Sequence, residues 1–496
     1  MICVTIGRGR HKSLLAEWKA AAEEGAQLVE LRIDCLRSTP NIKRIMSERY
    51  TPVVFTVRRG VDGGLWRLDE EKRLLLIREA IAAGVDYVDL EADIANKIPR
   101  FGKTKRIVSY HNFKKTPPDL EEYIHQLEDL DPDVIKFATL ADSITEASKI
   151  IQAASQAKAP AVGIAMGEVG KFTRYLAGKF GAPFTYAGYN PDRQFAPGMP
   201  SFKDLKRDFF YDQIDAQTEV YAVIGDPIQH SLSPAIHNAA YRELGMNKVM
   251  LPLLIPDEKL QESLDALEWL DLKGLAVTIP HKEEIIKLLD QEDGAVERTG
   301  SCNTVVIENG RWVGYNTDYR AAMDSLEEAM GGRTDSDISP LLNKQVMVLG
   351  AGGVARSIAY GLMRRGAGVI LCNRSEERAI KLAEEVGCRT VDWAMRAGTL
   401  ADVLINCTPV GMHPNVDETP IPPAGFKPGM IAFDTVYHPE STMFVKLARD
   451  RTCTTITGVD MFVRQAALQF KQFTGQDAPA TLMRDVVKRK LGPVAV

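Results

Sequence analysis

The sequence lacks the spacings that mark metal sites and the long apolar runs that mark membrane segments. Its seven cysteines are scattered and never form CxxC, and its eight histidines form neither HxxxH nor HExxH. These absences exclude the usual zinc patterns, so we predict no metal site. Apolar runs stay shorter than a membrane-spanning helix, and the start "MICVTIGRGR" has no apolar signal region. We therefore expect a cytoplasmic protein that does not enter a membrane.

Charge of one sign is also not in large excess. The formal net charge is -5, which gives no electrostatic reason to expect nucleic acid or an anionic membrane surface as a partner. The expected partners are small molecules, and the oligomeric state is left open. With 496 residues, the chain exceeds the size of one hydrophobic core, and this length suggests about three domains.

From residue 1 to about residue 188, short apolar runs alternate with amphipathic helical segments. Eight of these runs have the composition of strands: "MICVTIG", "QLVELRID", "TPVVFTVR", "DYVDLEAD", "RIVSYHNF", "DVIKFATL", "AVGIAMG" and "PFTYAGY". Eight β/α units in roughly 200 residues predict an α/β fold that begins with a (β/α)8 barrel. The active site of such a barrel lies at the C-terminal ends of its strands.

Ionisable residues stand near the ends of several predicted strands. Glu30 and Arg32 share one side of the second strand, Arg58 ends the third, Glu91 the fourth and His111 the fifth, and Lys136 lies within the sixth. Burying an ammonium group is costly unless it is paired or deprotonated, so a lone lysine in such a run usually reaches water. The convergence of these groups on one barrel mouth favours an active site instead.

A glycine-rich turn follows a later strand. "VMVLGAGGVARSIAYGL" reads as a strand, then Gly350-x-Gly352-x-x-Ala355, then a helix. Glycines permit a tight turn and close approach to a pyrophosphate, which binds the N–H groups of the helix N-terminus. We therefore predict a dinucleotide site, the alternative being a tight turn without a ligand.

The end of the next strand discriminates between the two nicotinamide cofactors. An NAD site normally has an acidic residue about twenty residues after the turn. This chain has Asn373 and Arg374 there, with Arg378 a turn later. Arginine favours a 2′-phosphate, so the sequence predicts NADP(H), with a solvated arginine as the alternative.

Taken together, the motifs resemble known families. In this order, "GDPIQHSLSPAIHN", "VTIPHK", "GSCNTVV", "GYNTD", "GAGGVAR", "NRS" and "VDMFVRQAALQF" resemble shikimate dehydrogenases from residue 219 onward. "VELRID", "SYHNF" and "DVIKFA" are similar to type I 3-dehydroquinate dehydratases. The whole chain resembles the bifunctional enzymes of the shikimate pathway that combine the two activities.

This resemblance implies a domain order. The dehydratase barrel would cover residues 1–212, fused to a two-domain α/β dehydrogenase. A substrate-binding domain would cover 219–321 and a Rossmann-like NADP domain 322–461, with helices in 462–490 packing back on the substrate-binding domain.

For the barrel, the resemblance implies that Lys136 forms a Schiff base, that His111 is the general acid/base and that Asp62 orients His111. Burial should lower the pKa of a lysine, so that a neutral amine attacks the substrate ketone. The iminium acidifies the adjacent C–H, and His111 removes that proton and later protonates the departing hydroxyl. The residues implied to hold the substrate's hydroxyls and carboxylate are Glu30, Arg32, Arg58 and Arg174.

The barrel departs from the family pattern at three positions. Asp62 stands where the family has Glu, and Phe195 and Met199 stand where it has Ser and Gln. Two alternatives therefore stay open: a degenerate barrel used for binding or regulation, and a different Schiff-base enzyme such as an aldolase.

For the dehydrogenase, the resemblance implies that Lys282 donates a proton to the carbonyl oxygen as hydride arrives and that Asp318 orients Lys282. The implied substrate residues are Ser231 and Ser233 for the carboxylate, and Thr278, Asn303, Tyr437 and Gln465 for the hydroxyls. The implied cofactor residues are Gly350, Ala351, Gly352, Gly353, Val354, Ala355, Asn373, Arg374, Ser375, Arg378, Thr408, Thr435 and Gly458. The predicted reactions are dehydration of 3-dehydroquinate and NADPH-dependent reduction of 3-dehydroshikimate to shikimate, with quinate as an alternative substrate.

Overall fold

A computed structural model describes residues 1–190, 193, 195–332 and 338–492. The chain divides into two compact units. The first contains residues 1–220, 227–229 and 247–272, and the second contains residues 221–226, 230–246 and 273–496. The predicted boundaries at 212, 219, 321 and 461 stay predictions.

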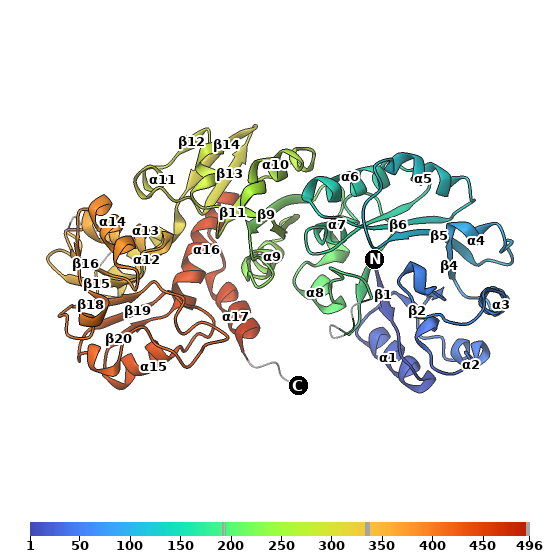
Figure 1. Ribbon diagram of the computed structural model, residues 1–496, viewed down its shortest axis with the longest axis horizontal. Helices are drawn as coiled ribbons and strands as arrows, with labels where there is room; N and C mark the ends of the chain where they lie inside the picture. The colour runs from blue at the N-terminus through green and yellow to red at the C-terminus, as the bar shows by residue number, and fades with distance from the viewer. Residues whose placement is uncertain (191–192, 194, 333–337, 493–496) are drawn as a thin grey trace. The chain divides into compact units, whose positions relative to one another are not determined.

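Eight parallel strands form the sheet of the first unit (Figure 1). They lie in the order β7-β6-β5-β4-β3-β2-β1-β8. Their bounds are β1 Ile2–Ile6, β2 Leu28–Arg32, β3 Val53–Thr56, β4 Tyr87–Glu91, β5 Lys105–Asn112, β6 Val134–Leu140, β7 Ala161–Met166 and β8 Thr185–Gly188. Each predicted strand run corresponds to one of them, so the predicted eight-stranded α/β barrel is confirmed.

Helices alternate with these strands. They are α1 His11–Glu23, α2 Ile42–Met46, α3 Glu70–Ala82, α4 Ala92–Ala95, α5 Leu120–Glu128, α6 Ile144–Ser155, α7 Phe172–Leu176 and α8 Phe202–Arg207. Local chemistry sets where the longer ones begin: Asp69 accepts a hydrogen bond from the Lys72 N–H, and Ser143 accepts one from the Glu146 N–H. Such side-chain caps satisfy N–H groups that lack partners in the first turn. The first unit also contains β10 Lys248–Leu254 and α10 Leu260–Asp265.

The second unit begins with five strands of a mixed sheet, in the order β9-β11-β13-β14-β12 within that sheet. β9 and β11 are parallel, and β13 is antiparallel to both β11 and β14. The strands are β9 Glu219–Gly225, β11 Gly274–Val277, β12 Gln291–Glu292, β13 Thr304–Glu308 and β14 Arg311–Tyr315, and the associated helices are α9 Ser233–Glu243, α11 Gly294–Thr299, α12 Thr317–Ala329, α16 Gly458–Thr474 and α17 Ala480–Leu491. α17 packs against α9, and α16 packs against α9 and α12.

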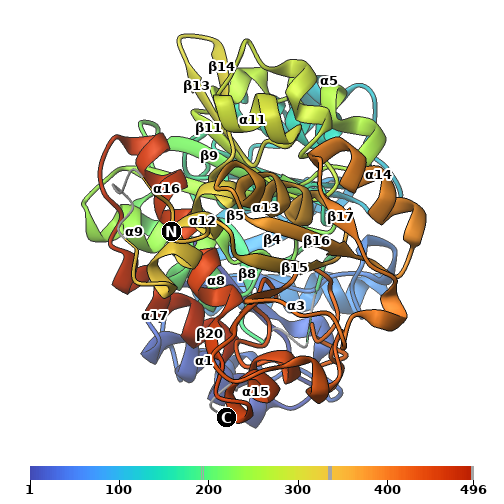
Figure 2. The ribbon, with the colours of Figure 1, turned by 90° about the vertical axis from the view of Figure 1, so that its left-hand side faces the viewer.

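A parallel sheet in the order β17-β16-β15-β18-β19-β20 completes the second unit. Its strands are β15 Gln345–Leu349, β16 Gly368–Cys372, β17 Arg389–Thr390, β18 Val403–Asn406, β19 Ile431–Asp434 and β20 Thr454–Ile456, with helices α13 Gly353–Arg364, α14 Glu376–Val386 and α15 Met443–Asp450. α13 packs against β15 and β16 (Figure 2). Val346 and Val348 join one apolar cluster while Met347 and Leu349 join another, as expected for a parallel sheet buried on both faces. The predicted Rossmann-like domain is therefore confirmed.

Among the described residues, no helix is both long and apolar enough to cross a membrane.

Candidate active sites

A pocket of about 440 Å³ lies where the barrel strands end. The barrel residues predicted to catalyse the reaction or bind the substrate line it: Glu30, Arg32, Arg58, Asp62, His111, Lys136 and Arg174. Glu91, at the end of the fourth strand, is not among the lining residues. Phe195 and Met199, which depart from the family pattern, line it as well. The convergence predicted from the strand ends is therefore real.

Lys136 is buried, but its surroundings are ionic rather than apolar. Its Nζ lies 3.1 Å from Asp89 Oδ2 and 3.4 Å from Glu30 Oε1, and 4.0 Å from the ring centre of Tyr186. The two carboxylates and the aromatic face all stabilise an ammonium group. From the sequence, apolar burial is expected to make the amine neutral. The ionic surroundings show that burial alone does not describe how a neutral amine arises here.

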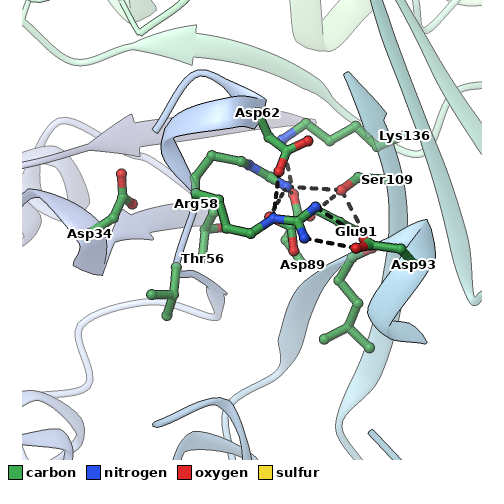
Figure 3. A network of polar contacts seen from close by, with 12 residues as sticks. Asp34, Thr56, Arg58, Asp62, Asp89, Glu91, Asp93, Ser109 and Lys136 are labelled. Carbon is green, nitrogen blue, oxygen red and sulfur yellow. Dashed lines mark hydrogen bonds and ion pairs between the residues drawn. The ribbon is translucent and has the colours of Figure 1, made fainter. Parts of the chain in front are cut away.

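Asp89 is the central residue that the sequence reasoning missed. Its fully buried carboxylate contacts Lys136, accepts a hydrogen bond from Ser109 Oγ at 2.6 Å, and lies 2.6 Å from Arg58 Nη2 (Figure 3). Burial raises the pKa of Asp89, but the positive charges of Arg58 and Lys136 outweigh burial and hold that pKa well below its usual range. Asp89 is therefore an anion that fixes two cations beneath the pocket.

Arg58 is engaged by protein carboxylates. Besides Asp89, it contacts Glu91 at 2.8 Å, and Glu91 also contacts the buried Arg73 at 2.7 Å. Arg32 is similarly engaged, through two hydrogen bonds to Asp34 at 3.0 and 2.8 Å. These guanidinium groups can still border a substrate, but their charges are already balanced.

Arg174 differs from the other arginines of the pocket. It is 1% exposed, and its Nε and Nη1 have no hydrogen-bond partner among the described residues. Burial lowers the pKa of Arg174 to about 10. An unpaired buried guanidinium facing a pocket is suited to an anionic group of a ligand.

His111 also carries an unpartnered atom, because Nδ1 is buried without a hydrogen bond in the described part of the chain. Burial and the nearby charges of Arg58 and Lys136 lower the pKa of His111 well below its ordinary value. The imidazole is therefore neutral at neutral pH. Asp62, predicted to orient it, instead contacts Arg59 at 2.7 Å. No hydrogen bond joins Asp62 to His111 among the described residues.

In the second unit, Lys282 and Asp318 form a close pair. Lys282 Nζ lies 2.7 Å from Asp318 Oδ2, and both side chains are partly exposed. Asp318 stands in the first turn of α12, which begins after the cap Asn316. The Asn316 amide donates to Ser301 O at 2.9 Å and to Ser357 Oγ at 3.1 Å, so the start of this helix is fixed from two sides.

Three predicted binding residues lie around this pair at the end of β11. Thr278 follows β11, and Asn303 is tied to the same strand end because its carbonyl accepts from the Val277 N–H. The Asn303 amide contacts Thr317 Oγ1 at 2.9 Å and Gln465 Oε1 at 3.5 Å. The structure thus joins Asn303 and Gln465 in one network beside Asp318.

The other predicted substrate residues belong to flanking loops. Ser231 and Ser233 are adjacent at the start of α9, where the Ser233 N–H contacts Ser231 Oγ at 3.4 Å. Tyr437 follows β19 and stacks on Phe462 at 4.8 Å. Their roles stay predictions, because no contact joins them to the Lys282–Asp318 pair in the described residues.

The glycine turn has the geometry that a dinucleotide site needs. Gly350 has φ +113°, and a Cβ there would lie 2.9 Å from the Cys407 carbonyl oxygen. At Gly352 and Gly353 an added Cβ would meet open space, at the N-terminus of α13, where Ala351, Val354 and Ala355 complete the turn. Gly458, at the start of α16, closely approaches the loop that follows β19, because a Cβ there would lie 2.2 Å from Val436 O.

Exposed cations stand at the end of β16. Arg374 and Arg378 are exposed, and their guanidinium groups form no hydrogen bond or ion pair among the described residues, while Asn373 Nδ2 bonds Ser375 O at 2.9 Å. This leaves two guanidinium groups available for a phosphate.

A buried acid connects the two loops that carry Thr408 and Thr435. Asn406 donates to Asp434 Oδ1 at 2.9 Å and accepts at Oδ1 from the Thr408 N–H and hydroxyl. Thr435 Oγ1 donates to Asn406 O at 2.9 Å. Asp434 is fully buried and also accepts from Thr442 Oγ1 at 2.6 Å. The carboxylate therefore positions both loops.

Family models match each part of the chain. A type I 3-dehydroquinase model matches residues 2–216, and a shikimate dehydrogenase substrate binding domain matches residues 223–305. The shikimate 5'-dehydrogenase C-terminal domain matches residues 458–488. A model described as NADP oxidoreductase, coenzyme F420-dependent, matches residues 345–421.

One relative spans nearly the whole chain. The chloroplastic bifunctional 3-dehydroquinate dehydratase/shikimate dehydrogenase of Arabidopsis thaliana is 34% identical over 510 residues, which cover 99% of this chain and 84% of the relative. The chain belongs to this bifunctional family. Its first unit thus contains the type I dehydroquinase domain, and its second contains shikimate dehydrogenase domains.

Relatives of the dehydrogenase part alone are also found. The shikimate dehydrogenase (NADP(+)) of Moorella thermoacetica is 40% identical over 291 residues, covering 56% of this chain and 96% of the relative. A crystal structure of a shikimate dehydrogenase in complex with NADP+ has a TM-score of 0.53 and 34% identity, covering 56% of this chain and 98% of that one. The Thermus thermophilus enzyme with NADP(H) and shikimate has a TM-score of 0.50 and 34% identity, covering 55% and 100%.

The contacts of Asp89 and Asp62 predict a large effect for Asp89→Asn and a small one for Asp62→Asn. Asp89→Asn removes the shared anion of two buried cations, so we expect a destabilisation of about 3–5 kcal/mol and a fall of roughly 100-fold in dehydratase kcat/KM through misplacement of Lys136. The matched control Asp62→Asn breaks a partly exposed pair and should cost less than about 1 kcal/mol. Thermal unfolding and dehydratase kinetics of both variants test this. If Asp62→Asn instead lost more dehydratase kcat/KM than Asp89→Asn, the predicted role of Asp62 in orienting His111 would be supported.

Burial of Asp434 predicts a pH-dependent stability. Burial raises the pKa of Asp434 to about 6, whereas an unfolded aspartate titrates near about 4. Between these values the folded state holds more protons, so its stability falls as pH rises through this window and levels off above it. Relative to Asp434→Asn, the wild type should lose about 2 kcal/mol between pH 4 and 7. Unfolding midpoints of both proteins measure this, and a pH-independent difference contradicts it.

Proposed function

We propose that this chain dehydrates 3-dehydroquinate to 3-dehydroshikimate in the barrel and reduces that product to shikimate with NADPH in the second unit. The observation that carries the proposal is the barrel pocket, where Lys136 lies beside unpartnered atoms of His111 and Arg174. Unpaired buried atoms are destabilising without a ligand, so they favour a site that binds one. The lysine and the neutral histidine in the same pocket favour catalysis over binding alone.

Arg174 binds the substrate's carboxylate in this proposal. Its unpaired nitrogens supply charge-assisted hydrogen bonds, whereas Arg32 and Arg58 are already balanced by Asp34, Asp89 and Glu91. Phe195 lies over Arg32, with 5.1 Å between the guanidinium carbon and the ring centre. Phe195 and Met199 therefore cover the pocket without offering hydrogen-bonding side chains.

The dehydration then uses His111 twice. Neutral His111 takes the ammonium proton, the amine of Lys136 attacks the ketone carbon, and His111 returns the proton as the carbinolamine loses water. The iminium draws electrons from the neighbouring C–H bond, so His111 can remove that proton and give it to the departing hydroxyl, which leaves as water. Hydrolysis of the iminium by water frees the product and Lys136. Glu30 and Asp89 stabilise the cationic nitrogen throughout.

The second reaction centres on Lys282 and Asp318. NADPH, when bound, supplies hydride to the carbonyl carbon of 3-dehydroshikimate. The ammonium of Lys282 donates a proton to the carbonyl oxygen, and Asp318 holds Lys282 through the contact of 2.7 Å while accepting from the neighbouring hydroxyl. Thr278, Asn303, Tyr437 and Gln465 bind hydroxyls, and Ser231 and Ser233 bind the carboxylate. Shikimate is preferred to quinate in this proposal.

NADP(H) fits the residues present. Gly350, Gly352 and Gly353 leave room for the pyrophosphate at α13, and the free cations Arg374 and Arg378 would hold the 2′-phosphate. Ser375, Thr408 and Thr435 complete the site. We also propose a reducing compartment such as the cytoplasm, consistent with seven free cysteines.

A coupled assay tests both activities together. With 3-dehydroquinate as the sole substrate, the wild type should consume NADPH, whereas Lys136→Ala should do so only when given 3-dehydroshikimate. Borohydride should trap the substrate on Lys136 in the wild type alone. A wild type that also requires 3-dehydroshikimate would reduce the barrel to a binding domain. Replacing NADPH with NADH, and shikimate with quinate, measures the two selectivities.

The environment of His111 predicts the acid side of the dehydratase pH profile. Because burial and two cations lower its pKa, the imidazole stays neutral below its ordinary pKa of about 6.5. The acid limb of kcat/KM should therefore lie well below pH 6.5, and activity should be lost only as pH falls through that limb. A limb centred at or above 6.5 would show that His111 is not the base of the free enzyme.

A further inference from the structure

The barrel pocket contains a third residue with an unpartnered polar atom. Tyr186, on β8, lines the pocket and is 1% exposed, and its Oη has no hydrogen-bond partner in the described structure. The sequence reads it as an ordinary core aromatic within "PFTYAGY". A phenylalanine would fill the same space without burying a hydroxyl, which is unfavourable when unpaired.

The ring of Tyr186 is fixed at the reacting amine. Lys136 Nζ lies 4.0 Å from the ring centre, so the ring of Tyr186 borders the amine that attacks the substrate ketone. Burial, with the charges of Glu30 and Asp89, raises the pKa of Tyr186. The hydroxyl therefore stays protonated and can donate.

We propose that the Tyr186 hydroxyl binds the substrate hydroxyl on the carbon next to the ketone and so sets the orientation of the ring before Lys136 attacks. Nζ becomes the imine nitrogen, and the substituent on the adjacent carbon is the polar group nearest to it. This inference rests on the proposed dehydratase function. It also accounts for substrate orientation in a pocket where Phe195 and Met199 replace hydrogen-bonding residues.

The test is Tyr186→Phe, which removes the oxygen but keeps the ring over Lys136. We expect kcat/KM for 3-dehydroquinate to fall at least tenfold, while the unliganded variant unfolds at the same or a higher temperature, because it no longer buries an unpaired hydroxyl. The matched control is Tyr211→Phe, since Tyr211 is equally buried but does not line the pocket. That variant should keep wild-type kcat/KM.

A substrate analogue lacking the hydroxyl next to the ketone identifies the group that Tyr186 binds. The wild type should lose at least tenfold in kcat/KM on this analogue, whereas Tyr186→Phe should lose much less because its partner is already absent. Equal losses in both proteins, or an unchanged kcat/KM of Tyr186→Phe with an active wild type, would overturn this inference alone. An inactive wild type would overturn the proposed function and this inference with it.

Discussion

The dehydratase site depends on the balance of charge beneath the barrel pocket. Asp89 holds Arg58 and Lys136 (Figure 3), while Glu91 holds Arg58 and Arg73. Taking any one of these charges out of water is expensive unless it is paired and hydrogen-bonded. The position of each charged side chain therefore constrains the position of its partner. Strand register then decides which of them reach the pocket. Ser109 and Lys136 are partners across β5 and β6, which brings both within reach of Asp89.

The two active sites hold their lysines in different ways. Lys136 is fixed by buried charges on β2 and β4, whereas Lys282 is fixed by one partly exposed aspartate at the start of α12. The difference suits the chemistry of each step. An iminium persists through several proton transfers and needs lasting stabilisation of its cation, while a lysine that donates one proton during reduction needs access to the carbonyl and a route for its own reprotonation.

Much of this architecture could be predicted from the sequence, because strand runs, the glycine turn and the residues at strand ends have local signals. Asp89 was missed although a signal was present: it stands two residues before Glu91, so both point to the same side of β4, as Glu30 and Arg32 do on β2. Asp62 was assigned to His111 by resemblance, and its pair with Arg59 is a contact that the resemblance does not reveal. Tyr186 carried no signal, because an aromatic residue in a strand is usually core.

The partners of a buried cation lie far away in the sequence, and only the folded contacts show which cations remain unpaired. Arg32, Arg58 and Arg174 look equivalent as candidate binding residues, yet the first two are balanced by carboxylates and the third is not. Certain polar atoms of Arg174, His111 and Tyr186 are buried and have no protein partner among the described residues, which is unfavourable unless a ligand binds them. Binding of a substrate that satisfies them releases this unfavourable energy at the reacting groups, where orientation decides the rate. The same atoms therefore weaken the fold and create its selectivity, and a barrel under selection for stability alone would lose them.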